Sequence, residues 1–343
     1  MSTTKSLGVG IVGVGAIGRL HCENYGTKKV PGASLVGIAD VNAAAAQELA
    51  TKFGVGAVYA DYHDLLADPS VDAIVVATPP FLKKEITLAA AESHKHVFCE
   101  KPMTLSLREA DEMIAAVQRA GIKFQVGYQK RSDPSFMAAR KAIEDGEIGK
   151  VILARGHNRD PPTTVAGWSA DPKKSGSVFL DTLSHDFDAL RYLTGSEVTR
   201  VYADGNATMY EELRKNGDYD TVVVDLRLAN GAVAQVDACG YTPYGFDSRA
   251  EVVGTEGGIN IGMGENSLTH VYKNGKVSNQ RHEYWGSRWA QAYRDEMAAF
   301  VQCIATDGRP RATIQDGRAA MEIGLAGWQS IKSEKPVGLP LSY

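Results

Sequence analysis

The sequence has few cysteines, and they are far apart. Cys22, Cys99, Cys239 and Cys303 form no C-x-x-C pair, which favours neither a zinc site nor a disulfide framework. Long apolar runs are also missing. None approaches the roughly 18 residues of a membrane span, and the first residues do not read as a signal peptide. We therefore expect reduced thiols, a cytoplasmic location and no membrane partner.

An excess of positive charge is missing too. The 343 residues include 37 Lys and Arg against 41 Asp and Glu, for a formal net charge of −4, so no basic surface for nucleic acid is expected. The sequence has no G-x-S-x-G elbow for a nucleophilic serine. His94 and His96 lie close together but lack a third ligand, so no metal site is expected. These absences leave small-molecule chemistry as the favoured class.

The first informative motif in the sequence is a glycine-rich turn. Residues 13–18 read Gly-Val-Gly-Ala-Ile-Gly and lie between an apolar run and a helix-like segment. In a dinucleotide-binding unit the three glycines permit a tight turn, close approach of a pyrophosphate and helix–strand packing, in that order. The pyrophosphate would accept hydrogen bonds from N–H groups at the start of the helix. The predicted cofactor contacts in this turn are Gly13, Gly15, Ala16, Ile17 and Gly18.

An acidic residue stands where this arrangement requires one. Asp40 follows the apolar run 35–39 and comes 22 residues after Gly18. A carboxylate in this place accepts hydrogen bonds from the adenosine ribose hydroxyls and repels a 2′-phosphate, which favours NAD over NADP. The alternative is an aspartate that begins a turn or caps the next helix.

The first 126 residues alternate short apolar runs with amphipathic segments of helix length, which indicates βαβ units and a parallel sheet. Predicted strands are 9–12, 35–39, 57–59, 73–77, 96–99 and 123–126. Predicted helices are 43–53, 83–92 and 106–120, the last with Ser106 as its cap. Six such strands suit a doubly wound sheet, in which ligands bind at the carboxyl ends of the strands. Asp40 and the segments 78–80 and 100–102 fall at that edge.

After residue 127 the pattern changes to that of an α+β domain. The sequence predicts helices at 134–144 and 177–193, a strand at 151–155, and a strand-rich region with a hairpin signal at Asn230-Gly231. Two final helices are predicted at 287–305 and 314–333. The fold class is therefore α/β: a parallel doubly wound domain over residues 1–126, and a second domain with a mainly antiparallel sheet over residues 127–343.

Lys101 is a candidate catalytic residue because it follows a predicted strand and precedes Pro102, which restricts its backbone. An ammonium at this edge would hydrogen-bond a substrate hydroxyl and help to move its proton. The alternative is an ordinary solvated lysine.

Asp181 and His185 are four residues apart in the predicted helix 177–193. Four-residue spacing makes them neighbours on one helix face, away from an apolar stripe. The stripe consists of Phe179, Leu183, Phe187 and Leu190. A carboxylate in that position would fix the tautomer of the imidazole and raise its basicity, as a general base near neutral pH requires. The alternative is an ordinary polar helix face.

Taken together, these motifs resemble the Gfo/Idh/MocA oxidoreductase family over nearly the whole chain. The motifs are the 13–18 turn, Thr78-Pro79-Pro80, Glu100-Lys101-Pro102 and the pair Asp181 and His185. Residues 127–131, 181–188 and 244–249 resemble the inositol 2-dehydrogenase branch of that family. The segment 158–175 matches no single branch, so a glucose- or xylose-type sugar dehydrogenase stays open as an alternative. A non-catalytic NAD-binding sensor is the alternative of another class.

The resemblance implies an NAD-binding Rossmann domain and a second domain whose open sheet mediates assembly into a homodimer or homotetramer. The last helix is expected either in that second domain or packed back on the first. The implied reaction is hydride transfer that oxidises a secondary hydroxyl of an inositol-type cyclic polyol, with Lys101, Asp181 and His185 as catalytic residues. Further implied cofactor contacts are Thr78, Pro79, Glu100 and Lys101. Implied substrate contacts are Arg131, His157, Asp188 and Tyr244.

Overall fold

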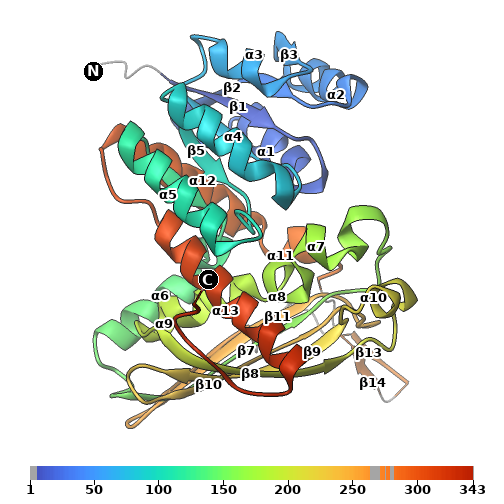
Figure 1. Ribbon diagram of the computed structural model, residues 1–343, viewed down its shortest axis with the longest axis vertical. Helices are drawn as coiled ribbons and strands as arrows, with labels where there is room; N and C mark the ends of the chain where they lie inside the picture. Colours follow the sequence, from blue (N-terminus) through green and yellow to red (C-terminus); the bar gives the residue numbers. More distant parts are fainter. Residues whose placement is uncertain (1–5, 263–270, 275, 279–281, 343) are drawn as a thin grey trace. The chain divides into compact units, whose positions relative to one another are not determined.

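The computed structural model describes residues 6–262, 271–274, 276–278 and 282–342 (Figure 1). The chain divides into two compact units. Unit 1 contains Met1–Gln129 and Tyr293–Arg318, and unit 2 contains Lys130–Ala292 and Ala319–Tyr343. Each unit therefore uses two separate stretches of the chain. The functional boundary expected after residue 126 stays a prediction.

Unit 1 is built on a six-stranded parallel sheet. Its strands are β1 (Leu7–Val12), β2 (Ala33–Ala39), β3 (Ala57–Tyr59), β4 (Ala73–Val76), β5 (His96–Cys99) and β6 (Phe124–Val126). The order β3-β2-β1-β4-β5-β6 is that of a doubly wound sheet, so this part of the predicted fold class is confirmed. The central strands are buried on both faces, and Val9 and Ile11 have no exposed surface, as expected for a sheet covered by helices.

The helices of unit 1 are α1 (Ala16–Gly26), α2 (Ala43–Phe53), α3 (Tyr62–Ala67), α4 (Pro80–Glu92), α5 (Leu107–Ala120), most of α12 (Ala290–Ala305) and the first turn of α13 (Ile314–Ser333). Three helices of this unit, α2, α3 and α5, begin at residues whose side chains cap them. The predicted cap Ser106 accepts a hydrogen bond from the backbone N–H of Glu109 at 3.1 Å. Gly121 ends the same helix in the left-handed conformation, which glycine adopts without steric cost.

The late segment 293–318 belongs to the interior of unit 1. Figure 1 shows α12, near the red end of the colour scale, among the early elements of the chain. Phe300 of α12 packs edge-on against Phe98 of β5, with ring centroids 5.8 Å apart. The side chain of Gln125 on β6 donates to the backbone carbonyl of Glu296 at 3.0 Å and accepts from the N–H of Arg311 at 3.3 Å. The sheet edge at β6 is thus fixed by residues distant in sequence.

Glu296 of α12 is a buried acid in this interior. Its side chain is 1% exposed, and within the described residues neither carboxyl oxygen has a hydrogen-bond partner. Burial raises the pKa of Glu296 well above its usual range, and the nearby Glu100 raises it further. In the folded chain the carboxyl therefore keeps its proton at pH values where an exposed glutamate is ionised.

We expect Glu296→Gln to stabilise the protein increasingly as pH rises. The folded wild type holds a proton that the unfolded chain releases above about pH 4.5, so the free energy of unfolding falls from that pH up to the raised folded pKa. Glutamine does not ionise, so thermal unfolding should show a larger gain in Tm at pH 8 than at pH 5. The exposed control Glu92→Gln should show no such trend. An equal Tm difference at both pH values would contradict this account.

Unit 2 is built on a seven-stranded mixed sheet. Its strands are β7 (Val151–Arg159), β8 (Val198–Asn206), β9 (Thr221–Leu228), β10 (Val233–Cys239), β11 (Asp247–Gly254), β12 (Gly258–Ile261) and β15 (Val337–Gly338), and a separate hairpin contains β13 (Val271–Lys273) and β14 (Lys276–Ser278). The order is β12-β11-β7-β10-β9-β8-β15. Only the β7–β10 pair of this sheet is parallel in the described residues. The predicted second domain with a mainly antiparallel sheet is thereby confirmed.

The helices of unit 2 lie on one side of this sheet, as Figure 1 shows for α8, α9 and α13. The helical segments are η1 (Gln129–Ser132), α6 (Pro134–Glu144), η2 (Gly167–Ala170), α7 (Pro172–Ser175), α8 (Ser177–Asp181), α9 (Ser184–Thr194), α10 (Glu211–Lys215), α11 (Trp285–Arg288) and the rest of α13. The predicted helices 177–193 and 287–305 are each broken in two. None of the helices that the structure describes is long and apolar enough to span a membrane.

Candidate active site

The glycine turn is shaped by backbone packing. A Cβ atom on Gly18 would lie 2.0 Å from the carbonyl oxygen of Gly13, and Gly13 itself has φ +94° beside the carbonyl of Ala77. A side chain at either position would force the backbone apart. A Cβ on Gly15 would meet nothing within 4 Å. Gly15 is therefore the place where a ligand can approach the backbone.

Helix α1 starts directly after this turn. Gly15 is its N-cap and offers no capping side chain. The first N–H groups of the helix, at Ala16, Ile17 and Gly18, face the helix N-terminus, where backbone dipoles favour an anionic ligand. The turn and the helix start together have the form of a pyrophosphate cradle.

Asp40 connects the end of β2 to the glycine turn. One carboxylate oxygen accepts from the N–H of Val14 at 2.6 Å, and the other accepts from the N–H of Asn42 at 2.7 Å. The cap of α2 is Asn42, whose side chain accepts from the N–H of Ala45 at 3.1 Å, so Asp40 is not a helix cap. Its carboxylate is held beside the turn, in the place where ribose hydroxyls are bound in such folds.

Thr78 and Pro79 lie after β4, at the same edge of the sheet. Pro79 is the N-cap of α4, which begins at Pro80. The hydroxyl of Thr78 is buried and has no hydrogen-bond partner among the residues that the structure describes. A buried hydroxyl without a partner is costly, so this atom fits a position that a bound molecule would satisfy.

Glu100 and Lys101 lie after β5, again at the carboxyl edge. Glu100 is buried, and its carboxylate accepts from the Nε2 of His21 at 2.7 Å. A Cβ on Gly127 would lie 2.9 Å from this carboxylate, so Gly127 makes room for it. Lys101 is half-buried, and its peptide bond to Pro102 is cis. Lys101 therefore lies at the same edge of the sheet as Thr78 and Pro79, two predicted cofactor contacts.

The continuous helix predicted for residues 177–193 is wrong. Helix α8 ends at Asp181, and α9 begins at Ser184. The N–H of Leu183 bonds back five residues to the carbonyl of Val178 at 2.9 Å, so the regular helical spacing is lost there. Asp181 is exposed and His185 is half-buried. The four-residue spacing argument does not apply across this break, and the pairing of Asp181 with His185 stays a prediction.

Two buried ion pairs join the segment before α6 to the start of α9. Lys130 bonds Asp186 at 2.6 Å, and both side chains are 2% exposed. Arg131 forms a two-pronged pair with Asp188, with Nε–Oδ2 and Nη2–Oδ1 distances of 2.9 and 2.8 Å. The predicted substrate contacts Arg131 and Asp188 are therefore brought together. Asp188 has no exposed surface, and its predicted contact with the substrate stays a prediction.

The Lys130–Asp186 ion pair was not among the contacts predicted from the sequence. The Lys130 ammonium also lies 5.8 Å from the ring centroids of both Phe136 and Trp289, a favourable setting for a desolvated cation. Asp186 directly follows His185. Two adjacent basic residues, Lys130 and Arg131, and two closely spaced aspartates, Asp186 and Asp188, are the pattern that could have indicated two parallel ion pairs.

His157 lies on the other face of the unit 2 sheet. A Cβ on Gly156 would lie 3.1 Å from Asp186 of α9, so Gly156 faces the helices and its neighbour His157 faces away, because side chains alternate along a strand. His157 lies 3.9 Å from Asp247, and burial lowers its pKa. His157 therefore faces away from α9, the helix that carries Asp188, and its predicted contact with the substrate stays a prediction. Tyr244, in the loop between β10 and β11, is 51% exposed.

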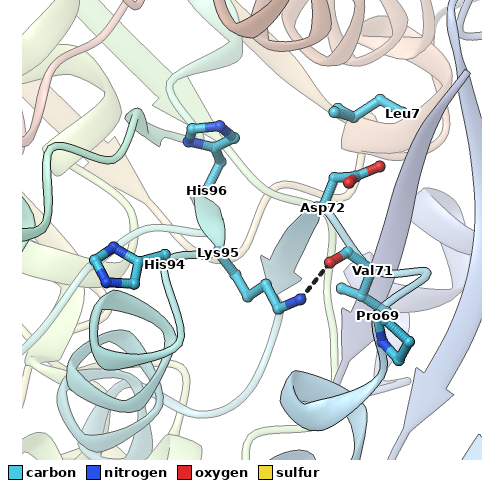
Figure 2. A pocket seen from close by; sticks show the side chains of 7 residues that line it. All are labelled: Leu7, Pro69, Val71, Asp72, His94, Lys95 and His96. Carbon is cyan, nitrogen blue, oxygen red and sulfur yellow. Dashed lines mark hydrogen bonds between the residues drawn. The ribbon is translucent and has the colours of Figure 1, made fainter. Parts of the chain in front are cut away.

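A hollow at the opposite edge of the unit 1 sheet is not this site. Figure 2 shows side chains around the amino ends of β1, β4 and β5. They are Leu7, Pro69, Val71, Asp72, His94, Lys95 and His96. Ligands of doubly wound sheets bind at the carboxyl ends. No group of three or more metal-ligating side chains is found in the described part of the chain.

Two family models together match most of the sequence. Residues 7–128 match the NAD-binding Rossmann-fold domain of the oxidoreductase family Gfo/Idh/MocA, and residues 140–339 match the C-terminal α/β domain of the same family. The chain belongs to the Gfo/Idh/MocA family. The predicted resemblance is confirmed, and so is NAD as the cofactor type of the first domain.

Relatives and solved structures of this family cover nearly the full length. The chain is 35% identical over 332 residues to a myo-inositol 2-dehydrogenase from Thermotoga maritima, covering 96% of this chain and 98% of the relative. It is 34% identical over 329 residues to a scyllo-inositol 2-dehydrogenase (NAD(+)) from Bacillus subtilis, covering 96% and 95%. A crystal structure of scyllo-inositol dehydrogenase from Lactobacillus casei with NAD(H) and scyllo-inositol aligns with a TM-score of 0.91 at 28% identity, covering 97% of this chain and 99% of that one.

The residues at the carboxyl edge of unit 1 fit an NAD molecule. The open space at Gly15, the carboxylate of Asp40 and the unsatisfied hydroxyl of Thr78 lie along one edge of the sheet. These groups would hold the pyrophosphate, a ribose and the nicotinamide end, respectively.

We expect Gly18→Ala to weaken NADH binding by at least about tenfold, or ~1.4 kcal/mol. The added methyl group would lie 2.0 Å from a backbone oxygen, so the turn must open and its N–H groups must move. Titration of NADH fluorescence measures the change. Gly56→Ala is the matched control, since a Cβ on Gly56 meets nothing within 4 Å. Equal affinities for the two variants would contradict the proposed cradle.

Proposed function

We propose that this chain is an NAD-dependent dehydrogenase that oxidises one secondary hydroxyl of an inositol-type cyclic polyol to a ketone. The observation that carries the proposal is full-length similarity, at 34–35% identity, to two inositol 2-dehydrogenases. The solved scyllo-inositol dehydrogenase with both NAD(H) and polyol supports it. The chain also has a lysine, an acid and an imidazole at the predicted catalytic positions: Lys101, Asp181 and His185.

In the proposed reaction, His185 accepts the proton of the substrate hydroxyl as general base, and Asp181 orients the imidazole and stabilises its charged form. Lys101 donates a hydrogen bond to the same oxygen and assists the proton transfer. NAD, when bound, supplies the hydride acceptor for the hydrogen on the carbinol carbon. The substrate loses one proton and one hydride, so it leaves as the ketone.

The polyol contacts that we propose are Arg131 and Tyr244. Arg131 is oriented by both oxygens of Asp188, so its guanidinium group has a fixed direction, as recognition of ring hydroxyls requires. Tyr244 is exposed and combines an apolar ring with a hydroxyl. Asp188 has the role of a positioning residue for Arg131.

A substrate panel tests the proposal. Purified protein is mixed with NAD and with myo-inositol, scyllo-inositol, glucose or xylose, and NADH formation is followed by absorbance. Turnover highest with an inositol supports the proposal. Turnover highest with an aldose indicates a sugar dehydrogenase, and NADH binding without turnover on any of these compounds indicates a sensor.

We expect His185→Ala to lower kcat by ~10²–10⁴-fold, the usual contribution of positioned proton transfer. NADH affinity should be unchanged because His185 belongs to unit 2. His63→Ala, at an exposed histidine of α3, is the control and should keep wild-type kcat. A His185→Ala enzyme with wild-type kcat would exclude this residue as the base.

We propose that copies of the chain assemble into a homo-oligomer, a dimer or tetramer, through the open face of the unit 2 sheet, in a cytoplasmic location. The strand register puts Tyr202, Val223 and Val233 on the face opposite α9, and these side chains are 40–42% exposed. Apolar side chains that are exposed on a sheet face favour a protein partner.

We expect Val223→Lys to lower the mass measured by size-exclusion chromatography with light scattering. The added charge would have to be desolvated in an interface through this face. The control Met209→Lys also replaces an exposed apolar residue, 49% exposed, outside the sheet. If Val223→Lys retains the wild-type mass, or if the wild type is a monomer, this interface is wrong.

A further inference from the structure

Lys83 is a buried lysine that contacts the backbone of the turn carrying Lys101. Its side chain is 2% exposed although it lies on α4, near the start of the helix. The ammonium donates hydrogen bonds to the carbonyl oxygens of Glu100, Lys101 and Pro102 at 2.6, 3.0 and 3.0 Å. Three consecutive carbonyl groups therefore point at one cation.

The chemistry of the two partners matches closely. An ammonium group has three N–H donors and no acceptor, and the turn offers three acceptors. A buried ammonium without such partners would be strongly destabilising. Because hydrogen bonds to a charged donor are stronger than those between neutral groups, the three carbonyl directions are fixed together. The backbone orientation of Lys101 is fixed with them.

A side chain of the turn, that of Glu100, is also anchored. Glu100 bonds His21 at 2.7 Å, so both the backbone and the first side chain of the turn are anchored inside unit 1. Helix α4 begins immediately after Thr78 and Pro79, two predicted cofactor contacts. Lys83 therefore connects the turn that carries Lys101 to helix α4. The start of this helix lies next to the predicted nicotinamide position.

We propose that Lys83 is a positioning residue that sets the place of Lys101 for proton handling; the inference rests on the proposed function, in which Lys101 acts on the substrate oxygen. Lys83 is not itself in contact with substrate in this account. It acts by holding the three carbonyls of residues 100–102 in one orientation, so that the Lys101 side chain leaves the turn in a fixed direction.

The test compares Lys83→Met with Lys95→Met. Lys95 is a matched control because its ammonium also bonds backbone carbonyls, those of Asp68 and Val71 at 3.2 and 2.6 Å. Figure 2 shows the Lys95–Val71 bond in the hollow at the amino edge of the sheet. Both variants remove a lysine that binds backbone in unit 1, but only one touches the Lys101 turn.

We expect Lys83→Met to lower kcat for the polyol by at least about tenfold, since a misplacement of about 1 Å can cost on the order of 100-fold in rate. The NADH dissociation constant and the KM for the polyol should stay within about threefold of wild type. Hydrogen–deuterium exchange of the protein without ligands should rise in peptides covering residues 100–104. Lys95→Met should change neither kcat nor exchange in that segment. Lys83→Gln, which keeps two N–H donors, should lie between wild type and Lys83→Met.

Several results would overturn the proposal. An unchanged kcat in Lys83→Met, an equal loss of kcat in Lys95→Met, or a loss confined to NADH affinity would each show a merely structural role. Failure of both Lys83 variants to fold would assign Lys83 to folding instead. If the wild type oxidises no polyol, the proposed function fails and the catalytic role of Lys83 fails with it, while the exchange experiment still decides whether Lys83 holds the turn.

Discussion

The close approach of the first turn to its own sheet is the constraint on which nucleotide binding in this chain depends. The carbonyl of Gly13 occupies the space where a side chain on residue 18 would lie, and Gly13 fits against Ala77 of the neighbouring strand connection. Asp40 then accepts the N–H of Val14, so the ends of β1, β2 and β4 are fixed relative to one another. The helix start and the acidic residue can serve one ligand because of this packing.

In each unit, buried polar pairs orient side chains next to predicted functional residues. Unit 1 contains the His21–Glu100 hydrogen bond, and unit 2 contains the buried ion pairs Lys130–Asp186 and Arg131–Asp188. Such pairs gain little net stability, because desolvation offsets the Coulomb attraction. Each pair instead fixes the orientation of an element next to a predicted catalytic or binding residue. A similar amount of apolar packing would stabilise the fold without orienting these groups.

The sequence was sufficient for the parallel sheet, since buried β-branched runs and the glycine turn are local signals that tertiary packing reinforces. It was not sufficient for residues 177–193, where a regular apolar stripe concealed the break after Asp181. The face of His157 depends on which residue of β7 lies beneath α9, and this register is a tertiary property. Lys83 and Glu296 carry no local mark of burial, because their surroundings come from residues distant along the chain.

The interleaved order of the two units has a consequence for biosynthesis. Residues 293–318 supply Phe300, Glu296 and the contacts of Gln125 inside the nucleotide-binding unit, yet a ribosome makes them after nearly all of unit 2. The first 129 residues must therefore wait with the β5–β6 side of their core incomplete while the second unit emerges. Folding of the nucleotide-binding unit is thereby coupled to synthesis of the chain as far as residue 318.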